Sequence, residues 1–207
     1  MLPDFKGKNV LDLGCGFGWH CRYAIENGAK SVMGIDLSEK MLTRAQEINK
    51  LEGILYERRA LEGLDYPAKQ FDIILSSLTL HYIESFDTMA QNIYQWLTSG
   101  GYFIFSVEHP VFTAEGGQDW IYNKNGEKTC WPVDSYFIEG KRNTTFLGEN
   151  VTKYHRTLTS YLNTLLKNGF KIKKIIEPEP SPEMLKEIPE MKDELRRPMM
   201  LLISAEK

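Results

Sequence analysis

Three glycines at alternate positions, Gly14, Gly16 and Gly18, follow an apolar run that ends in Asp12 and Leu13. Glycine has no Cβ, so it takes positive φ angles readily and lets the backbone approach a ligand closely. A helix that begins directly after such a turn points its free N–H groups at the same place. This order of residues predicts a site where a nucleotide-like ligand lies against the end of a buried strand.

A second acid, Asp36, ends the next apolar run, and Ser38 is a suitable N-cap for the helical period that follows. A carboxylate there can accept hydrogen bonds from both hydroxyls of a ribose, so this acid does not distinguish a dinucleotide from other ligands that contain adenosine. Two features favour S-adenosylmethionine. Asp12 lies two residues before the first glycine, and Gly100-Gly101 introduces a strand that ends near an acid.

Apolar β-rich runs alternate with helical periods along the chain, which is the pattern of a parallel sheet covered by helices on both faces. The expected strands are Asn9–Leu13, Ser31–Ile35, Ile54–Arg58, Phe71–Ser76, Tyr102–Val107, Phe170–Ile176 and Met199–Ala205. Helices are expected at Trp19–Asn27, Ser38–Asn49 and Phe86–Leu97, from about 155 to 167 and from about 183 to 195. The expected fold class is therefore α/β, as a single domain over residues 1–207.

Residues 109–150 interrupt this alternation with a long segment rich in glycine, proline and aromatic side chains. A connection of this length is usually functional or disordered, and its aromatic content argues against disorder. Asn123–Gly126 has the residues of a hairpin tip between Trp120–Tyr122 and Thr129–Trp131. We expect this segment to be an insertion that covers the substrate site.

Composition limits the kinds of binding partner and the cellular compartment that are expected for this chain. The chain has 25 basic and 28 acidic residues, a net charge of −3, which offers no concentrated positive field for nucleic acid. It has no signal-peptide pattern and no apolar run of about 18 residues, so no membrane partner is expected. Cys15, His20 and Cys21 lack a second ligand pair at the spacing of a zinc site, so no metal is expected. These features predict a reduced cytoplasmic protein and leave its oligomeric state open.

Four segments in order resemble the motifs of class I S-adenosylmethionine-dependent methyltransferases. They are Val10–Gly18, Gly34–Met41, Phe71–Ser77 and Leu97–Phe105. Glu108–Thr113, Trp131–Phe137 and Tyr154–Thr157 are similar to segments of a bacterial subgroup of small methyltransferases, which extends the resemblance to nearly the whole chain. The resemblance implies a Rossmann-like seven-stranded sheet, mostly parallel, in the order 3-2-1-4-5-7-6, with the last strand antiparallel and inserted between its neighbours.

The resemblance also implies S-adenosyl-L-methionine as cofactor and assigns residues to it. Under its methionine part lie Gly14, Cys15 and Gly16; Asp36 binds ribose; Leu37 and Met41 pack on adenine; Ala60, Leu61 and Glu62 match the segment that meets the adenine amino group. The usual acid of that segment falls at Ala60, so Glu62 either replaces it or is solvated. Asp12 and Ser76 complete the expected cofactor residues.

Methyl transfer from a sulfonium is an in-line displacement, so orientation and exclusion of water are the main requirements. A base is needed only for an acceptor that is protonated at working pH, and histidine suits that role. The candidates are His81, after the fourth expected strand, His109, after the fifth, and His155, which with Tyr154 and Arg156 is expected to open a helix. For each of these histidines the alternative is a purely structural role, without contact to the acceptor. The charges of Glu108, His155 and Arg156 equally suit a carboxylated or phosphorylated acceptor.

Only eight residues precede the first expected strand, whereas methyltransferases of this kind normally carry one or two covering helices there. Either the insertion supplies the whole cover, or the sequence starts at an internal methionine and lacks an N-terminal lid. The main expectation is a methyltransferase that acts on an unidentified small molecule. The alternatives are a non-catalytic or truncated protein that binds S-adenosylmethionine or S-adenosylhomocysteine, and a nicotinamide-dependent oxidoreductase.

Overall fold

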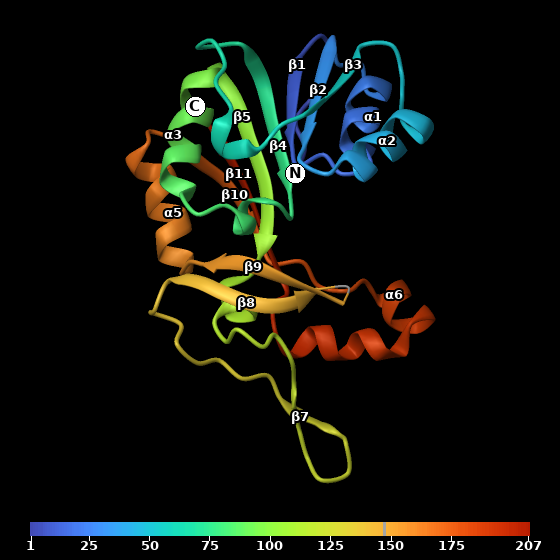
Figure 1. The fold of residues 1–207 in the computed structure, drawn as a ribbon, viewed down its shortest axis with the longest axis vertical. Coiled ribbons are helices and arrows are strands. Elements are labelled where there is room, and N and C mark those ends of the chain that lie inside the picture. The colour runs from blue at the N-terminus through green and yellow to red at the C-terminus, as the bar shows by residue number, and fades with distance from the viewer. Residues whose placement is uncertain (147) are drawn as a thin grey trace.

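A central sheet with helices on both faces forms the main body of the computed structural model, and a second layer lies beyond the carboxyl end of β5, below the sheet in Figure 1. The structure describes residues 1–146 and 148–207. The sheet strands are β1 (Asn9–Leu13), β2 (Ser31–Asp36), β3 (Ile54–Arg58), β4 (Phe71–Ser77), β5 (Leu97–Glu108), β10 (Lys171–Ile176) and β11 (Met200–Glu206). Between them lie α1 (Trp19–Glu26), α2 (Glu39–Ile48), α3 (Phe86–Trp96), α5 (Leu158–Lys167) and the 3₁₀ helices η1 (Leu61–Gly63) and η2 (Leu80–Tyr82).

The seven strands are arranged in the order β10-β11-β5-β4-β1-β2-β3. Strands β1 to β5 pair in parallel, whereas β11 runs antiparallel to both of its neighbours. Counted among the sheet strands alone, this is the predicted order 3-2-1-4-5-7-6 with the last strand inserted. The expected fold is therefore confirmed.

Alternation along the strands divides the core between the two faces of the sheet. On β1, Val10 packs with Cys21 of α1, whereas Leu11 and Leu13 belong to the cluster that contains α3 and α5 side chains. Because successive strand residues point to opposite faces, Asp12 faces α1. Within the described residues, no helix is long and apolar enough to cross a membrane.

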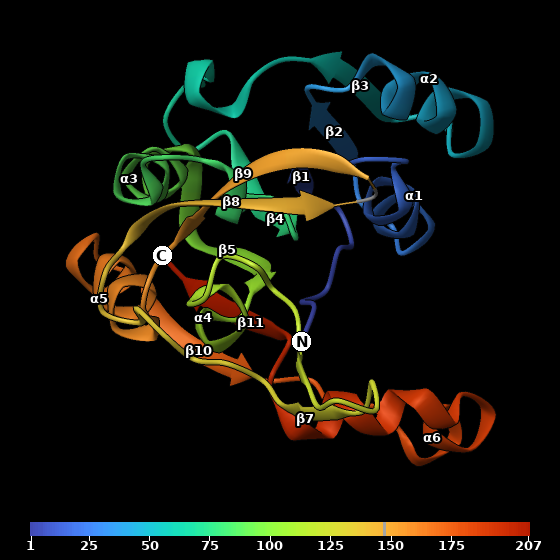
Figure 2. The same cartoon turned by 60° about the horizontal axis from the view of Figure 1, so that its bottom comes forward.

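A hairpin that the sequence did not predict begins in the insertion and extends beyond it, formed by β8 (Gly140–Phe146) and β9 (Glu149–His155). The hairpin crosses below the end of β5 in Figure 1 and passes in front of β1 and β4 in Figure 2. The expectation of a helix from about residue 155 was wrong at its start, because β9 continues to His155 and α5 begins at Leu158. The buried positions Thr144, Lys153 and His155 are polar, so these strands carry no alternating apolar signal.

The remaining elements of the second layer are short. They are α4 (Pro110–Thr113), β6 (Ile121–Tyr122), β7 (Lys128–Cys130), α6 (Pro182–Glu187) and the 3₁₀ helix η3 (Pro189–Arg196). Strands β6 and β7 form the predicted hairpin. The single helix expected from about 183 to 195 is wrong, because Pro189 has no N–H to donate and α6 ends before it.

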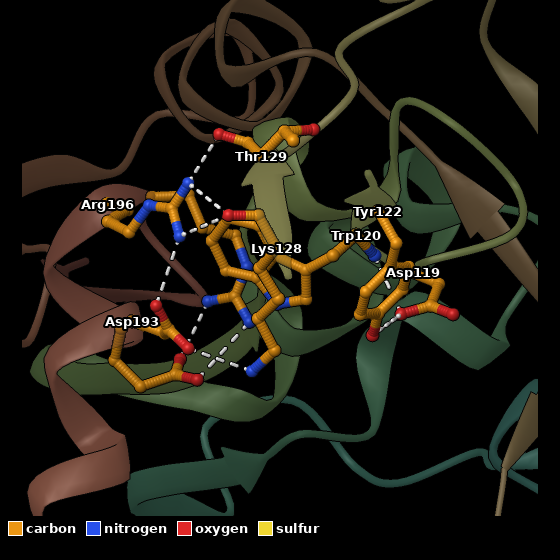
Figure 3. Close-up of polar contacts among 9 residues, drawn as sticks. Asp119, Trp120, Tyr122, Lys128, Thr129, Asp193 and Arg196 are labelled. Atoms are coloured by element: carbon orange, nitrogen blue, oxygen red, sulfur yellow. Dashed lines mark hydrogen bonds and ion pairs between the residues drawn. The ribbon is translucent and has the colours of Figure 1, made fainter. Parts of the chain in front are cut away.

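The β6–β7 hairpin is fastened to η3 by charged groups (Figure 3). The Arg196 guanidinium donates to the backbone oxygen of Thr129 at 2.6 Å. Asp193 accepts from Arg196 at 3.1 Å and from the Lys128 ammonium at 2.9 Å. Two segments that lie far apart in the sequence are thereby held side by side.

The aromatic side chains of the insertion surround a second arginine, Arg197, whose side chain is only 6 % exposed. Its guanidinium carbon lies 4.3 Å from the ring centre of Trp131, 4.9 Å from that of Phe112 and 5.4 Å from that of Trp120. Glu194 accepts from the same guanidinium at 2.7 Å. The aromatic cluster of the insertion is therefore filled by a cation of the chain itself.

Removing the buried guanidinium should loosen the second layer. We expect Arg197→Met to lower the free energy of unfolding by about 2 kcal/mol or more, the size of a desolvated cation–π interaction, and to speed tryptic cleavage at Lys124. Arg44→Met is the control, because that side chain lies on α2, is 55 % exposed and should contribute at most about 0.5 kcal/mol. Urea denaturation of both variants measures this, and equal losses would contradict the assignment.

Candidate active site

The loop between β1 and α1 has three glycines in the left-handed region, at φ +74° for Gly14, +52° for Gly16 and +77° for Gly18. A Cβ on Gly14 would lie 2.1 Å from Thr79 Oγ1, and one on Gly18 would lie 2.1 Å from the Tyr56 hydroxyl oxygen. A Cβ on Gly16 would meet no atom within 4 Å. The outer glycines are therefore required by packing, and the middle glycine faces open space.

Asp36, at the end of β2, holds this loop in place. Its Oδ2 accepts the Gly16 N–H at 2.9 Å, and its Oδ1 accepts the Ser38 N–H at 2.8 Å. The N–H groups of Gly14 and Cys15 both donate to the backbone oxygen of Ile35, at 2.8 and 2.9 Å. The glycine turn and the acid predicted from the sequence thus meet at the carboxyl ends of neighbouring parallel strands.

Asp12 is fully buried beneath the loop. Its Oδ2 accepts from the Cys21 thiol at 3.4 Å, while its Oδ1 is buried without a hydrogen-bond partner. Burial raises the pKa of Asp12 to about 6, against the attraction of His20, which lowers it. An orphaned buried carboxylate oxygen is costly, so it marks a place where a cationic or hydrogen-bonding ligand group would be stabilised.

The other predicted cofactor residues differ in their exposure. Leu37 is 65 % and Met41 37 % exposed, which leaves apolar surface available beside Asp36. Ala60 and Glu62 are exposed and Leu61 is buried. Glu62 could therefore either contact the adenine in place of the usual acid or remain solvated.

Ser76 is buried, and its hydroxyl donates to the backbone oxygen of Leu13 at 2.9 Å. This bond ties β4 to β1, so the side chain of Ser76 is already engaged within the protein. The hydroxyl proton is therefore used, while the hydroxyl oxygen keeps its capacity to accept.

The three predicted catalytic histidines are buried and engaged with protein groups. His81 Nδ1 accepts the Glu108 N–H at 3.4 Å, and burial lowers the pKa of His81 to about 4, so its ring is neutral with the proton on Nε2. His109 Nδ1 accepts the Val111 N–H at 3.0 Å, and its Nε2 lies 2.8 Å from Glu177 Oε1. His81 and His109 thus contact different protein groups.

His155 lies between two partners, Thr113 Oγ1 at 2.7 Å from Nδ1 and the backbone oxygen of Tyr136 at 2.8 Å from Nε2. A carbonyl oxygen only accepts, so Nε2 carries a proton and Nδ1 accepts from the Thr113 hydroxyl. Burial lowers the pKa of this imidazole. The ring therefore connects parts of the insertion and has no free lone pair.

A buried ion pair joins the end of β5 to the insertion. The Lys153 ammonium lies 2.5 Å from Glu108 Oε1 and donates to Gln118 Oε1 at 2.9 Å, while Gln118 Nε2 donates to Glu108 Oε2 at 2.8 Å. Arg156 donates to the backbone oxygens of Ile83 and Glu84, at 2.6 and 2.7 Å. Glu108 and Arg156, suggested from sequence with His155 as acceptor-binding groups, are therefore engaged with protein atoms.

His20 was not among the catalytic candidates, yet it lines a cavity of about 200 Å³ between α1 and the carboxyl ends of β4 and β5. One feature of the sequence could have indicated His20 as a site residue. It lies in the first turn of the helix after the glycine loop, and such residues lie near the carboxyl ends of the central strands. Its neighbours across the sheet follow only from strand register.

Comparisons with known proteins agree with this geometry. A family model described as a methyltransferase domain matches residues 11–105. A Listeria monocytogenes structure described as an S-adenosylmethionine-dependent methyltransferase is 60 % identical, with a TM-score of 0.96, over 100 % of this chain and 92 % of that one. A second such structure, from Mesorhizobium loti, is 44 % identical, with a TM-score of 0.92, over 100 % and 94 % of the two chains.

An uncharacterized protein of Haemophilus influenzae is 38 % identical over 218 residues, which cover 100 % of this chain and 84 % of that protein. Neither the nicotinamide-dependent oxidoreductase nor the non-catalytic binder is favoured by these similarities. The glycine loop, the acid that holds it and the sheet order all agree with the matched family. The chain belongs to the S-adenosylmethionine-dependent methyltransferases, with S-adenosylmethionine as its cofactor.

Proposed function

We propose that the protein transfers a methyl group to a small molecule, and that the cofactor lies against Gly16 between Asp36 and Asp12. The observation that carries this proposal is the closed loop, in which Gly16 faces open space while its N–H is held by Asp36. Asp36 would accept the ribose hydroxyls, with Leu37 and Met41 beside the adenine. The orphaned Asp12 Oδ1 supports a cationic group above it.

Gly14, Cys15 and the backbone of Ser76 would form the rest of the surface on which the cofactor lies. Ala60, Leu61 and Glu62 would border the adenine, where Leu61 supplies buried apolar surface and Glu62 remains exposed. When bound, the cofactor supplies an activated methyl group on a sulfonium. The protein's part is to align the acceptor with that group and exclude water, and orientation alone supplies roughly 7–11 kcal/mol in favourable cases.

The insertion of residues 109–150 would act as the cover of this site. The β8–β9 hairpin crosses the carboxyl ends of the central strands, which supports that role (Figures 1 and 2). His109 and His155 would position the insertion, because their ring nitrogens lie against protein groups. His81, neutral with its proton on Nε2, would offer a hydrogen-bond donor and would not act as a base.

A binding measurement tests the cofactor site. We expect S-adenosylhomocysteine to bind the unsubstituted protein in a calorimetric titration, and Asp36→Ala to weaken binding roughly 10- to 150-fold, because a hydrogen bond to a charged group contributes about 1.5–3 kcal/mol. Glu39→Gln is the matched control, since Glu39 follows on the same turn and its side chain is 75 % exposed. Unchanged affinity in Asp36→Ala would contradict the assignment.

The buried acid predicts an unusual dependence of stability on pH. The ordinary pKa of an aspartic acid, near 3.8, is below the pKa of about 6 for Asp12 in the folded protein. The unfolded chain therefore ionises first, and the folded state loses stability as pH rises between these values. Above pH 6 the full penalty remains, roughly 3 kcal/mol for about two pKa units.

Asp12→Asn removes this penalty. We expect the free energy of unfolding of the variant, relative to the unsubstituted protein, to rise by up to about 3 kcal/mol between pH 4 and pH 8. Chemical denaturation at each pH without cofactor measures the difference. Asp4→Asn, at an exposed acid, should show no such change. A pH-independent difference for Asp12→Asn would refute the raised pKa.

A further inference from the structure

Two cysteines lie side by side at the proposed cofactor site, Cys15 in the glycine loop and Cys21 in α1, and both are free thiols. A Cβ built on Gly34 of β2 would lie 2.9 Å from Cys15 Sγ and 2.8 Å from Cys21 Sγ. Both sulfur atoms therefore border the space that Gly34 leaves by having no side chain. Because helical side chains tilt towards the N-terminus of their helix, the Cys21 thiol points back at the loop.

The two thiols differ in their surroundings. Cys21 is 0 % exposed, and its thiol donates to Asp12 Oδ2 at 3.4 Å. Contact with the Cys15 thiol and burial raise the pKa of Cys21, so that it remains a protonated thiol. Cys15 is 6 % exposed, and its Sγ lies 4.0 Å from the backbone oxygen of Gly16 in the loop. A small molecule from solvent therefore meets Cys15 first, with Cys21 behind it.

This arrangement suits reversible oxidation of the pair. A cysteine that is oxidised to a sulfenic acid condenses with a neighbouring thiol to a disulfide, which protects it from further oxidation. Asp12 already accepts from the Cys21 thiol, and its pKa of about 6 leaves the carboxylate able to take that proton near neutral pH. In a reducing compartment, a disulfide of this kind is transient and acts in redox sensing.

We propose that Cys15 and Cys21 form a redox modification site, at which a peroxide closes a reversible disulfide that weakens cofactor binding. The Cys15 sulfur attacks hydrogen peroxide, the oxygen–oxygen bond breaks, water leaves and Cys15 becomes a sulfenic acid. The Cys21 sulfur then attacks the Cys15 sulfur and the sulfur–oxygen bond breaks. The Cys21 proton passes by way of Asp12 to the leaving hydroxide, which departs as a second water. The two sulfurs together lose two electrons, which reduce one molecule of peroxide.

Closing this disulfide would displace the glycine loop. A disulfide holds its sulfurs about 2.05 Å apart, closer than two separate thiols approach, so one of the segments has to move. Cys21 is packed in the core, whereas Cys15 is held in the loop by its N–H, which donates to the backbone oxygen of Ile35 at 2.9 Å. The next residue, Gly16, donates to Asp36. Drawing Cys15 towards α1 therefore strains the bond that holds the loop.

The effect on binding rests on the cofactor site proposed above. If the disulfide weakens binding of the cofactor, bound cofactor must disfavour the disulfide by the same factor. Saturating S-adenosylhomocysteine should therefore protect Cys15 and Cys21 from peroxide.

Peptide masses test the modification. Cys130→Ser removes the exposed third cysteine, so that no bond between two molecules forms. The full chain is treated with hydrogen peroxide, denatured, alkylated and digested with trypsin. No lysine or arginine lies between Asn9 and Cys21, so both cysteines stay in the tryptic peptide of residues 9–22. We expect this peptide to lose two hydrogen atoms and to be alkylated only after dithiothreitol. Two alkylated cysteines, or a sulfinic or sulfonic acid at Cys15, would overturn the proposal.

Calorimetry tests the consequence in the same protein. We expect the reduced form to bind S-adenosylhomocysteine and the disulfide form to bind it roughly 10-fold more weakly or worse, the effect of losing one hydrogen bond to a charged group. Dithiothreitol should restore the affinity. Equal affinities of the two forms would refute the proposal. Failure of the reduced form to bind would instead overturn the cofactor site, so the two failures are distinguishable.

Cys21→Ser, made in the Cys130→Ser protein, is the matched variant. Serine also donates to Asp12 but cannot form the disulfide, so the reduced variant should bind S-adenosylhomocysteine as its parent does. Under peroxide its Cys15 should proceed to a sulfinic acid, which dithiothreitol does not reduce. A loss of affinity in this variant that dithiothreitol reverses fully would show that the disulfide is not the cause.

Discussion

The Asp36 carboxylate, through its two hydrogen bonds to Gly16 and Ser38, fixes the loop on which the site depends. One oxygen holds the turn that leaves β1, and the other holds the start of the turn into α2. Because β1 and β2 are parallel neighbours, the two turns leave the sheet at the same edge and can share one acid. Their closure leaves Gly16 as the only one of the three loop glycines that faces open space.

Charged side chains next to the insertion are used mainly to hold it in place. Lys153 is bound to Glu108 and Gln118, and Arg197 lies among three aromatic rings. Buried charges are tolerated only when they are paired, so these groups have little freedom to bind a ligand as well. The cavity beside His20, by contrast, is lined by Met1, Leu2 and side chains of β4, β5 and β11 that are mainly apolar or hydroxyl-bearing.

The central sheet was predictable because its signals are local. Runs such as Ser31–Ile35 are apolar and end at turn residues, and four motifs in order set the strand sequence. The β8–β9 hairpin was not predictable, because its buried side chains include Thr144, Lys153 and His155. Polar residues become acceptable inside a protein only when tertiary partners satisfy them, and these partners lie far away in the sequence. The helix break at Pro189 has a different, local cause, because proline has no N–H to donate, and the helical periodicity around it outweighed that signal in the prediction.

The sequence by itself determined the fold class, the cofactor and the loop with its two acids, because glycine conformation and strand periodicity are properties of short segments. Only the tertiary structure decided what the histidines do. His81, His109 and His155 follow strands or stand near their ends, as a base would, yet both ring nitrogens of His109 and His155 and the Nδ1 of His81 lie against protein groups. His20 shares a cavity with residues of β4 and β5, and that grouping depends on strand register across the sheet.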